Sequence, residues 1–153
     1  MRGVYEAVYK ITGLASAKTL MYITAPSSKV VEILEASVTH PGSNVTNQQL
    51  EVAIQRVSSL GTPTATSVTP TPVEVGDAAA GSTVKGNVTA SEPTYSSAVD
   101  GGREGYASLG GWRYQPQPES RFYIAPSGSV GVYMTSTPTS TDTIVRVVFR
   151  EIG

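Results

Sequence analysis

Apolar and polar residues alternate with a period of two along much of this chain, and the alternation predicts β-strands. The clearest run is residues 4–12, where the apolar side chains share one face of the expected strand and Glu6 and Lys10 lie on the other. Other runs are rich in the β-branched and aromatic residues that suit a pleated sheet. These runs predict strands over residues 18–24, 29–40, 48–57, 83–89, 129–136 and 143–152, with short apolar segments at 112–114 and 122–124.

A short phrase occurs twice, as Tyr22-Ile23-Thr24-Ala25-Pro26-Ser27 and as Tyr123-Ile124-Ala125-Pro126-Ser127. Proline has no backbone N–H and a fixed φ, so neither Pro26 nor Pro126 fits inside a central strand. Each phrase therefore predicts a corner between strands, and the two units suggest that the first and last strands lie close together. We expect an all-β fold: a two-sheet antiparallel β-sandwich with jelly-roll-like connections and little or no helix, formed by residues 1–153 as a single domain.

Two glutamates interrupt the alternation in residues 29–40. Strict alternation would bury either Glu32 or Glu35, whereas a β-bulge near Ile33 and Leu34 turns both outward, because one extra residue reverses the phase. We expect that bulge, followed by a hairpin of residues 29–40 with 48–57. The side chains expected in the core are Tyr9, Ile11, Val31, Ile33, Val52, Ile54, Phe122, Val132, Val147 and Phe149.

Two segments lack the alternation. Residues 58–82 hold prolines and glycines among many Thr and Ser residues, which predicts a long extended crossover rather than a packed element. A loop of this length is uncommon unless it is functional or spans between sheets. Within it, Asp77 followed by three alanines and Gly81 predicts one capped helical turn. Residues 92–111 consist mostly of turn residues.

Composition narrows the classes of function. Hydrophobic residues make up 39% of the chain and charged residues 15%, and the net charge is −1. A charge so small and so evenly spread gives no basic footprint for nucleic acid or an anionic membrane, so neither partner is expected. The absence of cysteine excludes disulfides and thiolate chemistry. The start of the chain has no signal-peptide core and no run approaches a membrane span, so we expect synthesis in the cytoplasm.

Residues able to support catalysis are few. His40 is the single histidine and lies in a turn, where an ordinary surface role is expected. Glu32 and Glu35 form a conceivable carboxylate pair of the glycosidase type, but charges on the outer face of a strand explain them equally well. Asp77, Asp100 and Asp142 are too scattered for a calcium loop. With no phosphate-binding motif either, we expect no enzyme activity, no cofactor and no metal site.

Aromatic residues gather late in the chain, at Trp112, Tyr114, Phe122 and Tyr123. They suit a sugar-stacking platform, a core or an interface, and the last two uses are the commoner. The run Trp112-Arg113-Tyr114 joins the three residue types most enriched at binding hot spots. We predict that it contacts another subunit, with Trp112 and Tyr114 on one side and Arg113 on the other. The alternative is that Trp112 caps the core at one end of the sandwich.

The order of these features resembles a known family. The stretches are Ala25-Pro26-Ser27 into Val31-Glu32-Ile33-Leu34-Glu35-Ala36-Ser37-Val38, then Glu51-Val52-Ala53-Ile54, Gly61-Thr62-Pro63, Val68-Thr69-Pro70 and Ala125-Pro126-Ser127-Gly128-Ser129-Val130-Gly131-Val132. Together they are similar to head decoration, or cement, proteins of tailed bacteriophages, of jelly-roll type. The likeness covers most of the chain, and no catalytic residues come with that family.

The resemblance implies a virion structural protein on the capsid exterior. It implies a homotrimer that clamps neighbouring subunits of the phage major capsid protein, so the expected partners are that protein and the chain itself. An accessory head-fibre or tail domain that binds host-surface glycans is the alternative, and it would need exposed aromatic residues in a groove. A lone enzyme domain is the third reading, supported only by the carboxylates.

Overall fold

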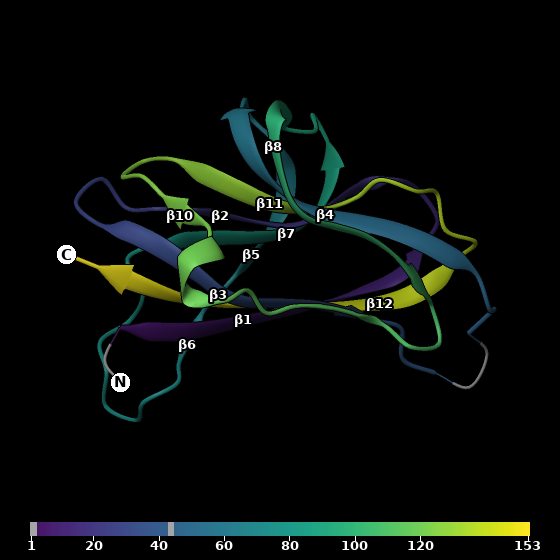
Figure 1. Ribbon diagram of the computed structural model, residues 1–153, viewed down its shortest axis with the longest axis horizontal. Coiled ribbons are helices and arrows are strands. Elements are labelled where there is room, and N and C mark those ends of the chain that lie inside the picture. Colours follow the sequence, from purple (N-terminus) through teal and green to yellow (C-terminus); the bar gives the residue numbers. More distant parts are fainter. Residues whose placement is uncertain (1–2, 43–44) are drawn as a thin grey trace.

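The computed structural model describes residues 3–42 and 45–153, and most of this part is β-strand (Figure 1). The strands are β1 (Val4–Leu14), β2 (Lys18–Thr24), β3 (Val30–Thr39), β4 (Gln49–Ser59), β5 (Thr64–Val68), β6 (Thr71–Pro72), β7 (Thr83–Ala90), β8 (Thr94–Ala107), β9 (Trp112–Tyr114), β10 (Tyr123–Ile124), β11 (Ser129–Met134) and β12 (Thr141–Ile152). One short 3₁₀ helix, η1 (Pro118–Ser120), is the only helical element of the described residues. None of their helices is long and apolar enough to cross a membrane.

The strands form two antiparallel sheets that pack face to face. The first, here called the β1 sheet, has the order β10-β3-β12-β1-β6, with β9 also paired to β3. The second, the β2 sheet, has the order β5-β7-β2-β11-β4-β8. Within this arrangement β1-β12-β3-β9 faces β2-β11-β4-β8, which is the strand order of an eight-stranded jelly roll. The predicted β-sandwich with jelly-roll-like connections is confirmed.

The chain crosses between the sheets at nearly every early connection. As a result β3 and β4 lie in different sheets, so the predicted hairpin between them is wrong. The first and last strands do lie together, with Val4 opposite Arg150 at one end of the β1–β12 pair and Leu14 opposite Thr141 at the other. Strand β12 is therefore an interior strand of the β1 sheet, between β1 and β3.

The two proline corners are confirmed and lie against each other. Pro26 falls between β2 and β3, and Pro126 falls between β10 and β11. The Ala25 N–H donates to the Gly128 carbonyl at 2.9 Å, and the Ser127 N–H donates to the Pro26 carbonyl at 3.3 Å. These backbone hydrogen bonds join corners that are about a hundred residues apart in the sequence, beside the paired β2 and β11.

The predicted bulge in β3 is present. Val148 of β12 lies opposite Glu35 and Phe149 lies opposite Ile33, which leaves Leu34 as the extra residue. The bulge keeps Ile33 in the core and puts both glutamates on the outer face of the β1 sheet. Glu32 is nevertheless only 1% exposed, because side chains of neighbouring strands and loops cover it.

Residues 58–82 contain more regular structure than the prediction allowed. Strand β4 continues to Ser59, β5 pairs with β7 in the β2 sheet, and β6 pairs with β1 in the other sheet. The segment therefore spans between sheets. The helical turn expected after Asp77 does not form; its carboxylate instead accepts a hydrogen bond from the Gly3 N–H at 2.9 Å.

Residues 92–111 also differ from the prediction, because most of them form the edge strand β8. One of its glycines, Gly102, has φ of +59°, and a Cβ there would clash with the Tyr114 ring that crosses the strand. In the same way the ring of Tyr9 lies over Gly86 of β7.

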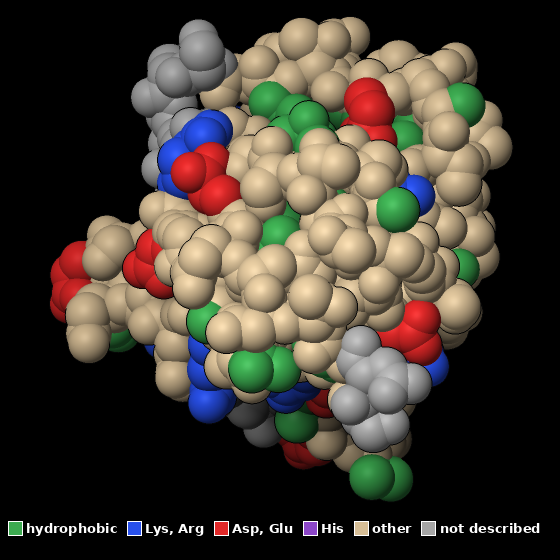
Figure 2. Space-filling view, turned by 90° about the vertical axis from the view of Figure 1, so that its right-hand side faces the viewer, with side chains coloured by type: hydrophobic (Ala, Val, Ile, Leu, Met, Phe, Trp, Pro, Cys, Tyr) green, Lys and Arg blue, Asp and Glu red, His purple; other side chains and the backbone are tan. Residues whose placement is uncertain are grey.

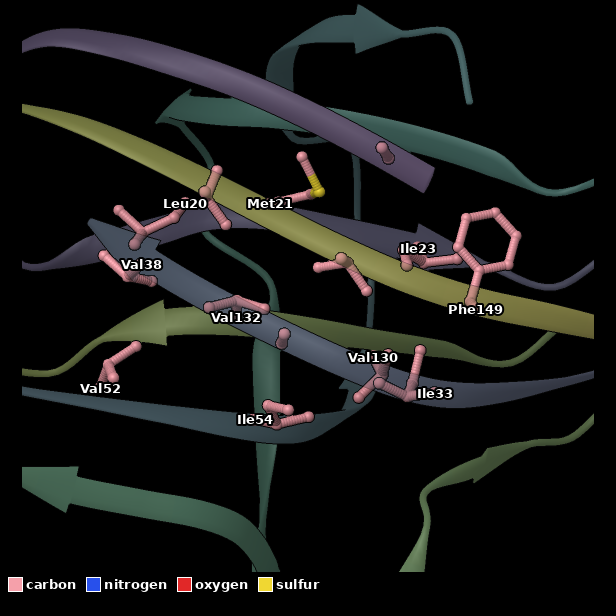
Figure 3. Close-up of a cluster of buried hydrophobic side chains, with 14 of the residues drawn as sticks. Leu20, Met21, Ile23, Ile33, Val38, Val52, Ile54, Val130, Val132 and Phe149 are labelled. Carbon is pink, nitrogen blue, oxygen red and sulfur yellow. The ribbon is translucent and has the colours of Figure 1, made fainter. Parts of the chain in front are cut away.

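The core lies between the two sheets, and Figure 3 shows part of it, with Ile23, Ile33, Val130 and Phe149 directed into the same space. Nine of the ten predicted core residues are buried: Ile11, Val31, Ile33, Val52, Ile54, Phe122, Val132, Val147 and Phe149. Tyr9 is half-buried and packs against the margin of the core. The period of two thus identified the buried face of β1, β3, β4, β11 and β12.

Candidate interaction surface

The outer face of the β1 sheet mixes aliphatic and charged side chains. Along β12 the inward residues Val145, Val147 and Phe149 are buried, so alternation places Ile144, Arg146, Val148 and Arg150 on the outside. Across the sheet, Val8 of β1 lies opposite Arg146, and Glu6 lies opposite Val148. Charged and aliphatic side chains therefore alternate both along this face and across it.

The charges of this face are paired with one another. Arg146 bridges Glu6 of β1 and Glu35 of β3, and Arg113 of β9 also reaches Glu35 at 3.0 Å. Further along, Lys10 and Asp142 are 3.0 Å apart. That pairing, with the Gly13 N–H as a second donor, lowers the pKa of the Asp142 carboxyl. The network connects β1, β12, β3 and β9 in one row of cross-strand contacts.

Glu32 is the most deeply buried charge of the face. Arg121 and the Tyr123 hydroxyl each donate to its carboxylate at 3.1 Å, and Arg150 pairs with the other oxygen. Burial by itself raises the pKa of this carboxyl, but the hydrogen bonds from Arg121, Arg150 and Tyr123 outweigh burial and lower the pKa below its ordinary value. Glu32 is therefore a charged structural group, held by ion pairs with Arg121 and Arg150 and by the Tyr123 hydroxyl.

Residues 110–121 border the face and divide it into two depressions. One, of about 460 Å³, lies between Leu34 and Val148 on the sheet and the Gln115-Pro116-Gln117-Pro118 segment. The other is lined by Ser37, Thr39 and Arg146 together with the Gly110-Gly111 turn. Arg113 stands beside the second depression with 61% of its side chain exposed. A partner that covers this face would meet Arg113 at its β9 edge.

Trp112, Arg113 and Tyr114 were predicted to form an interface. As the alternation indicated, Trp112 and Tyr114 lie on one side of β9 and Arg113 lies on the other. Trp112 is only 3% exposed, and its ring stacks on that of Tyr114 at 6.3 Å between centroids. Tyr114 in turn meets Phe122 edge to face. Trp112 is thus covered by its own chain, in agreement with the core-cap alternative, while Arg113 is the exposed member. The interface role stays a prediction, and Arg113 is the side chain placed to fulfil it.

The aromatic cluster does not form an open sugar-binding platform. Trp112 and Phe122 are buried in the core, and Tyr114 packs between them. Tyr123 is 44% exposed, but its hydroxyl is bound to Glu32. No pair of these rings is therefore presented together to solvent.

The candidate catalytic groups are all engaged in the fold. His40 is half-buried rather than a surface residue: its ring stacks on Tyr106, and its Nε2 is 2.8 Å from the Tyr106 hydroxyl. Burial lowers the pKa of His40, and the Asp142 backbone carbonyl near Nδ1 opposes that shift only in part. Glu32 and Glu35 are each held by two arginines.

The aspartates considered for calcium do not come together. Asp77 binds the Gly3 N–H, and Asp142 binds Lys10 at another part of the β1 sheet. The side chain of Asp100 lies outside the described part. In the residues that the structure describes, no group of three or more His, Asp or Glu side chains is placed to hold a metal ion.

Reasoning from the sequence missed the arginines that organise this face. Arg146 and Arg150 are four residues apart in a strand, so they share one face, and that spacing was visible in the sequence. Their partners Glu35 and Glu32 are three apart, which matches only when the bulge at Leu34 is included. Arg121 could not be found in this way, because it lies in a loop whose path depends on η1.

Comparison of the chain with protein-family models, with curated proteins and with solved structures found no match.

Proposed function

We propose that the chain is a non-enzymatic structural protein of a virion, which decorates and stabilises a phage capsid by binding the outside of the major capsid protein lattice. The proposal combines the resemblance to head decoration proteins with one feature of the structure, the outer face of the β1 sheet. Its charges are already neutralised by neighbours, and aliphatic side chains lie between them. A partner protein can cover such a face without leaving an unpaired buried charge, which is the costly case at interfaces.

The proposal includes homotrimerisation on the capsid surface and no catalysis. Glu32, Glu35 and His40 would each have to leave several partners before they could act on a substrate. Arginine is enriched at protein interfaces relative to the rest of the surface, and Arg113 is the exposed arginine at the edge of this face. Arg113 is therefore assigned to the contact with the capsid protein.

The test is co-sedimentation of purified protein with phage heads that lack it, comparing the native chain with Arg113→Ala. We expect Arg113→Ala to weaken binding at least about tenfold, since hot-spot arginines contribute about 2 kcal/mol or more. Arg103→Ala is the matched control, because Arg103 makes a similar 2.9 Å pair with Glu51 on the β2 sheet. Its binding should equal that of the native chain.

Two outcomes would contradict the proposal. If the native chain fails to bind heads but binds host-surface glycans on an array, the head-fibre or tail alternative replaces it. If heads bind Arg113→Ala and the native chain equally well, the protein decorates through another face.

A further inference from the structure

A projecting loop, residues 73–76, displays two valines to solvent. Val75 is fully exposed and Val73 is 58% exposed, although most large aliphatic side chains of the described residues are buried. Figure 1 shows this loop in teal below the N-terminal label, at the end of the sandwich where β1 begins. Between the valines lies Glu74, which gives the loop its single charge. We call residues 73–76 the valine loop.

The valine loop is held in place at both ends. Before it, β6 pairs with β1, and the Val73 N–H donates to the Val4 carbonyl at 2.9 Å. After it, the Asp77 N–H closes a turn onto the Glu74 carbonyl at 3.2 Å, and the Asp77 carboxylate accepts the Gly3 N–H. Apolar side chains fixed in this way bind a partner with little further loss of conformational freedom.

A complementary groove lies beside the second proline corner. Its floor is formed by the buried Phe122, Ile124 and Val130, its more open apolar residues are Val57 and Ala125, and its volume is about 140 Å³. That volume has room for an aliphatic side chain of the size of valine. Arg56 is the only charged residue of the lining, and its guanidinium lies 5.4 Å from the centre of the Phe122 ring. We call this the corner groove.

The valine loop and the corner groove lie at the same end of the molecule but at opposite edges. One cross-strand row of the β1 sheet runs from Val4 through Arg150 and Glu32 to Tyr123. The valine loop adjoins the β6 edge beyond Val4, and the corner groove adjoins the β10 edge at Tyr123. Their charges are opposite in sign, Glu74 on the loop and Arg56 in the groove.

The other end of the sandwich faces the viewer in Figure 2, where hydrophobic and charged side chains are scattered among other side chains and backbone. The valine loop and the corner groove both lie at the opposite end, which bears β6 and β10. A contact between two different patches on identical chains is heterologous, and it closes into a ring when the rotation between copies allows.

We propose that the valine loop of one copy inserts into the corner groove of a second copy of this chain, with Val75 in the groove and Glu74 near Arg56. The inference rests on the self-association included in the proposed function and specifies the surfaces that produce it. Repetition of this contact around an axis gives a closed ring in which every loop and every groove is occupied.

The first test is sedimentation velocity of the native chain and Val75→Asp over a range of micromolar concentrations. The native chain should sediment as a ring, and Val75→Asp should raise the dissociation constant at least about tenfold, because a carboxylate cannot enter an apolar groove without loss. Leu109→Asp is the matched control, since Leu109 is also an exposed aliphatic residue, at 67%. It should associate like the native chain.

The second test is a mixing experiment. Val75→Asp has a damaged loop and an intact groove, whereas Arg56→Glu has an intact loop and a groove that repels Glu74. Each variant alone should be monomeric, and an equal mixture should form dimers that grow no further, because only one productive contact exists. A symmetric contact of like with like would give no such dimers. If Arg56→Glu loses its fold, as judged by circular dichroism, Val57→Arg at the same groove takes its place.

Failure of this inference is distinct from failure of the proposed function. An oligomer that survives Val75→Asp, or a mixture of the two variants that forms no dimers, would overturn the inference alone. A native chain that forms the ring through Val75 but does not bind heads would support the inference and contradict capsid decoration.

Discussion

Glu32 shows how one residue can be placed on an outer face and still be buried. Its carboxylate is surrounded by Arg121, Arg150 and Tyr123, which arrive from a loop, from β12 and from β10. A charge removed from water is tolerated when its partners are also fixed, and removal of one member leaves the others unpaired. Glu32 therefore contributes more to stability than an ordinary surface glutamate does.

We expect Glu32→Gln to lower the free energy of unfolding by about 2–3 kcal/mol at pH 7. This is less than the 3–5 kcal/mol typical of a fully buried pair, because Arg121 and Arg150 keep 26% and 35% of their side chains exposed. Urea denaturation measures the loss. Glu51→Gln, in the exposed pair with Arg103, should cost less than about 1 kcal/mol.

The difference in stability between the native protein and Glu32→Gln should depend on pH. The pKa of Glu32 is lowered in the folded state, so its stabilisation is complete above the unfolded pKa of about 4.3 and is lost as the pH falls through the lower folded value. The difference in stability between native protein and Glu32→Gln should therefore shrink as the pH is lowered from about 5 to 3. A difference that stays constant would contradict the assigned ion pairs.

Sequence reasoning was strong for side chains that face the core and weak for those that face a neighbour. Ile54 and Phe149 follow from alternation, because burial of apolar side chains depends on the local period. The burial of Trp112 could not be predicted in this way, because an aromatic side chain suits a core and an interface equally well. The partners of Glu32 depend on the strand register and on a loop, neither of which leaves a local pattern.

At the scale of the element, the bulge in β3 determines which side chains enter the core. Leu34 is the extra residue, and Val31 and Ile33 before it, like Ala36 and Val38 after it, all face inward. If Leu34 instead took part in a regular ladder, one half of the strand would present its other face to the core. The bulge was predictable because two glutamates at odd spacing conflicted with strict alternation.

Deletion of Leu34 should leave a protein that melts cooperatively. Ile33 and Glu35 then become consecutive and can keep their consecutive partners Phe149 and Val148 of β12, so every other side chain of β3 stays on its present face. Thermal unfolding by circular dichroism tests this, with Leu34→Ala, which retains the bulge, as the control. Loss of the cooperative melt in the deletion variant alone would show that folding needs the bulge itself and not only the direction of the side chains.

Three strands escaped prediction for physical reasons. Strand β8 is an edge strand that contains several glycines, and Gly102 accommodates the Tyr114 ring rather than forming a turn. Strands β5 and β6 are short, polar and close to prolines, which suits edge positions where one side of the backbone needs no partner. Alternation is weak in such strands because neither face is fully covered.

At the scale of the whole molecule, the β1 sheet depends on the joining of the two ends of the chain. Strand β12 is inserted between β1 and β3, so the core side of this sheet is completed only when residues 141–152 are in place. The Glu151 N–H donates to the Gly3 carbonyl at 2.9 Å, so the two ends are also close in space. Whether a linker joins residues near the two ends should therefore matter less for folding than whether β12 is present.

A circular permutant should separate these two requirements. We expect a chain in which a short glycine-serine linker joins the two ends, with new ends opened between Gly61 and Thr62, to fold with a cooperative melt. Both residues are exposed and lie outside the strands, and joining ends that are already adjacent adds little loop-closure entropy. Truncation after Ser140 is the matched comparison: it leaves the order of the remaining residues unchanged but removes β12, and with it the buried Val145, Val147 and Phe149. The truncated chain should show no cooperative melt and should be digested rapidly by protease. If it folds, or if the permutant does not, the sheet is not organised around β12 in the way that its position between β1 and β3 implies.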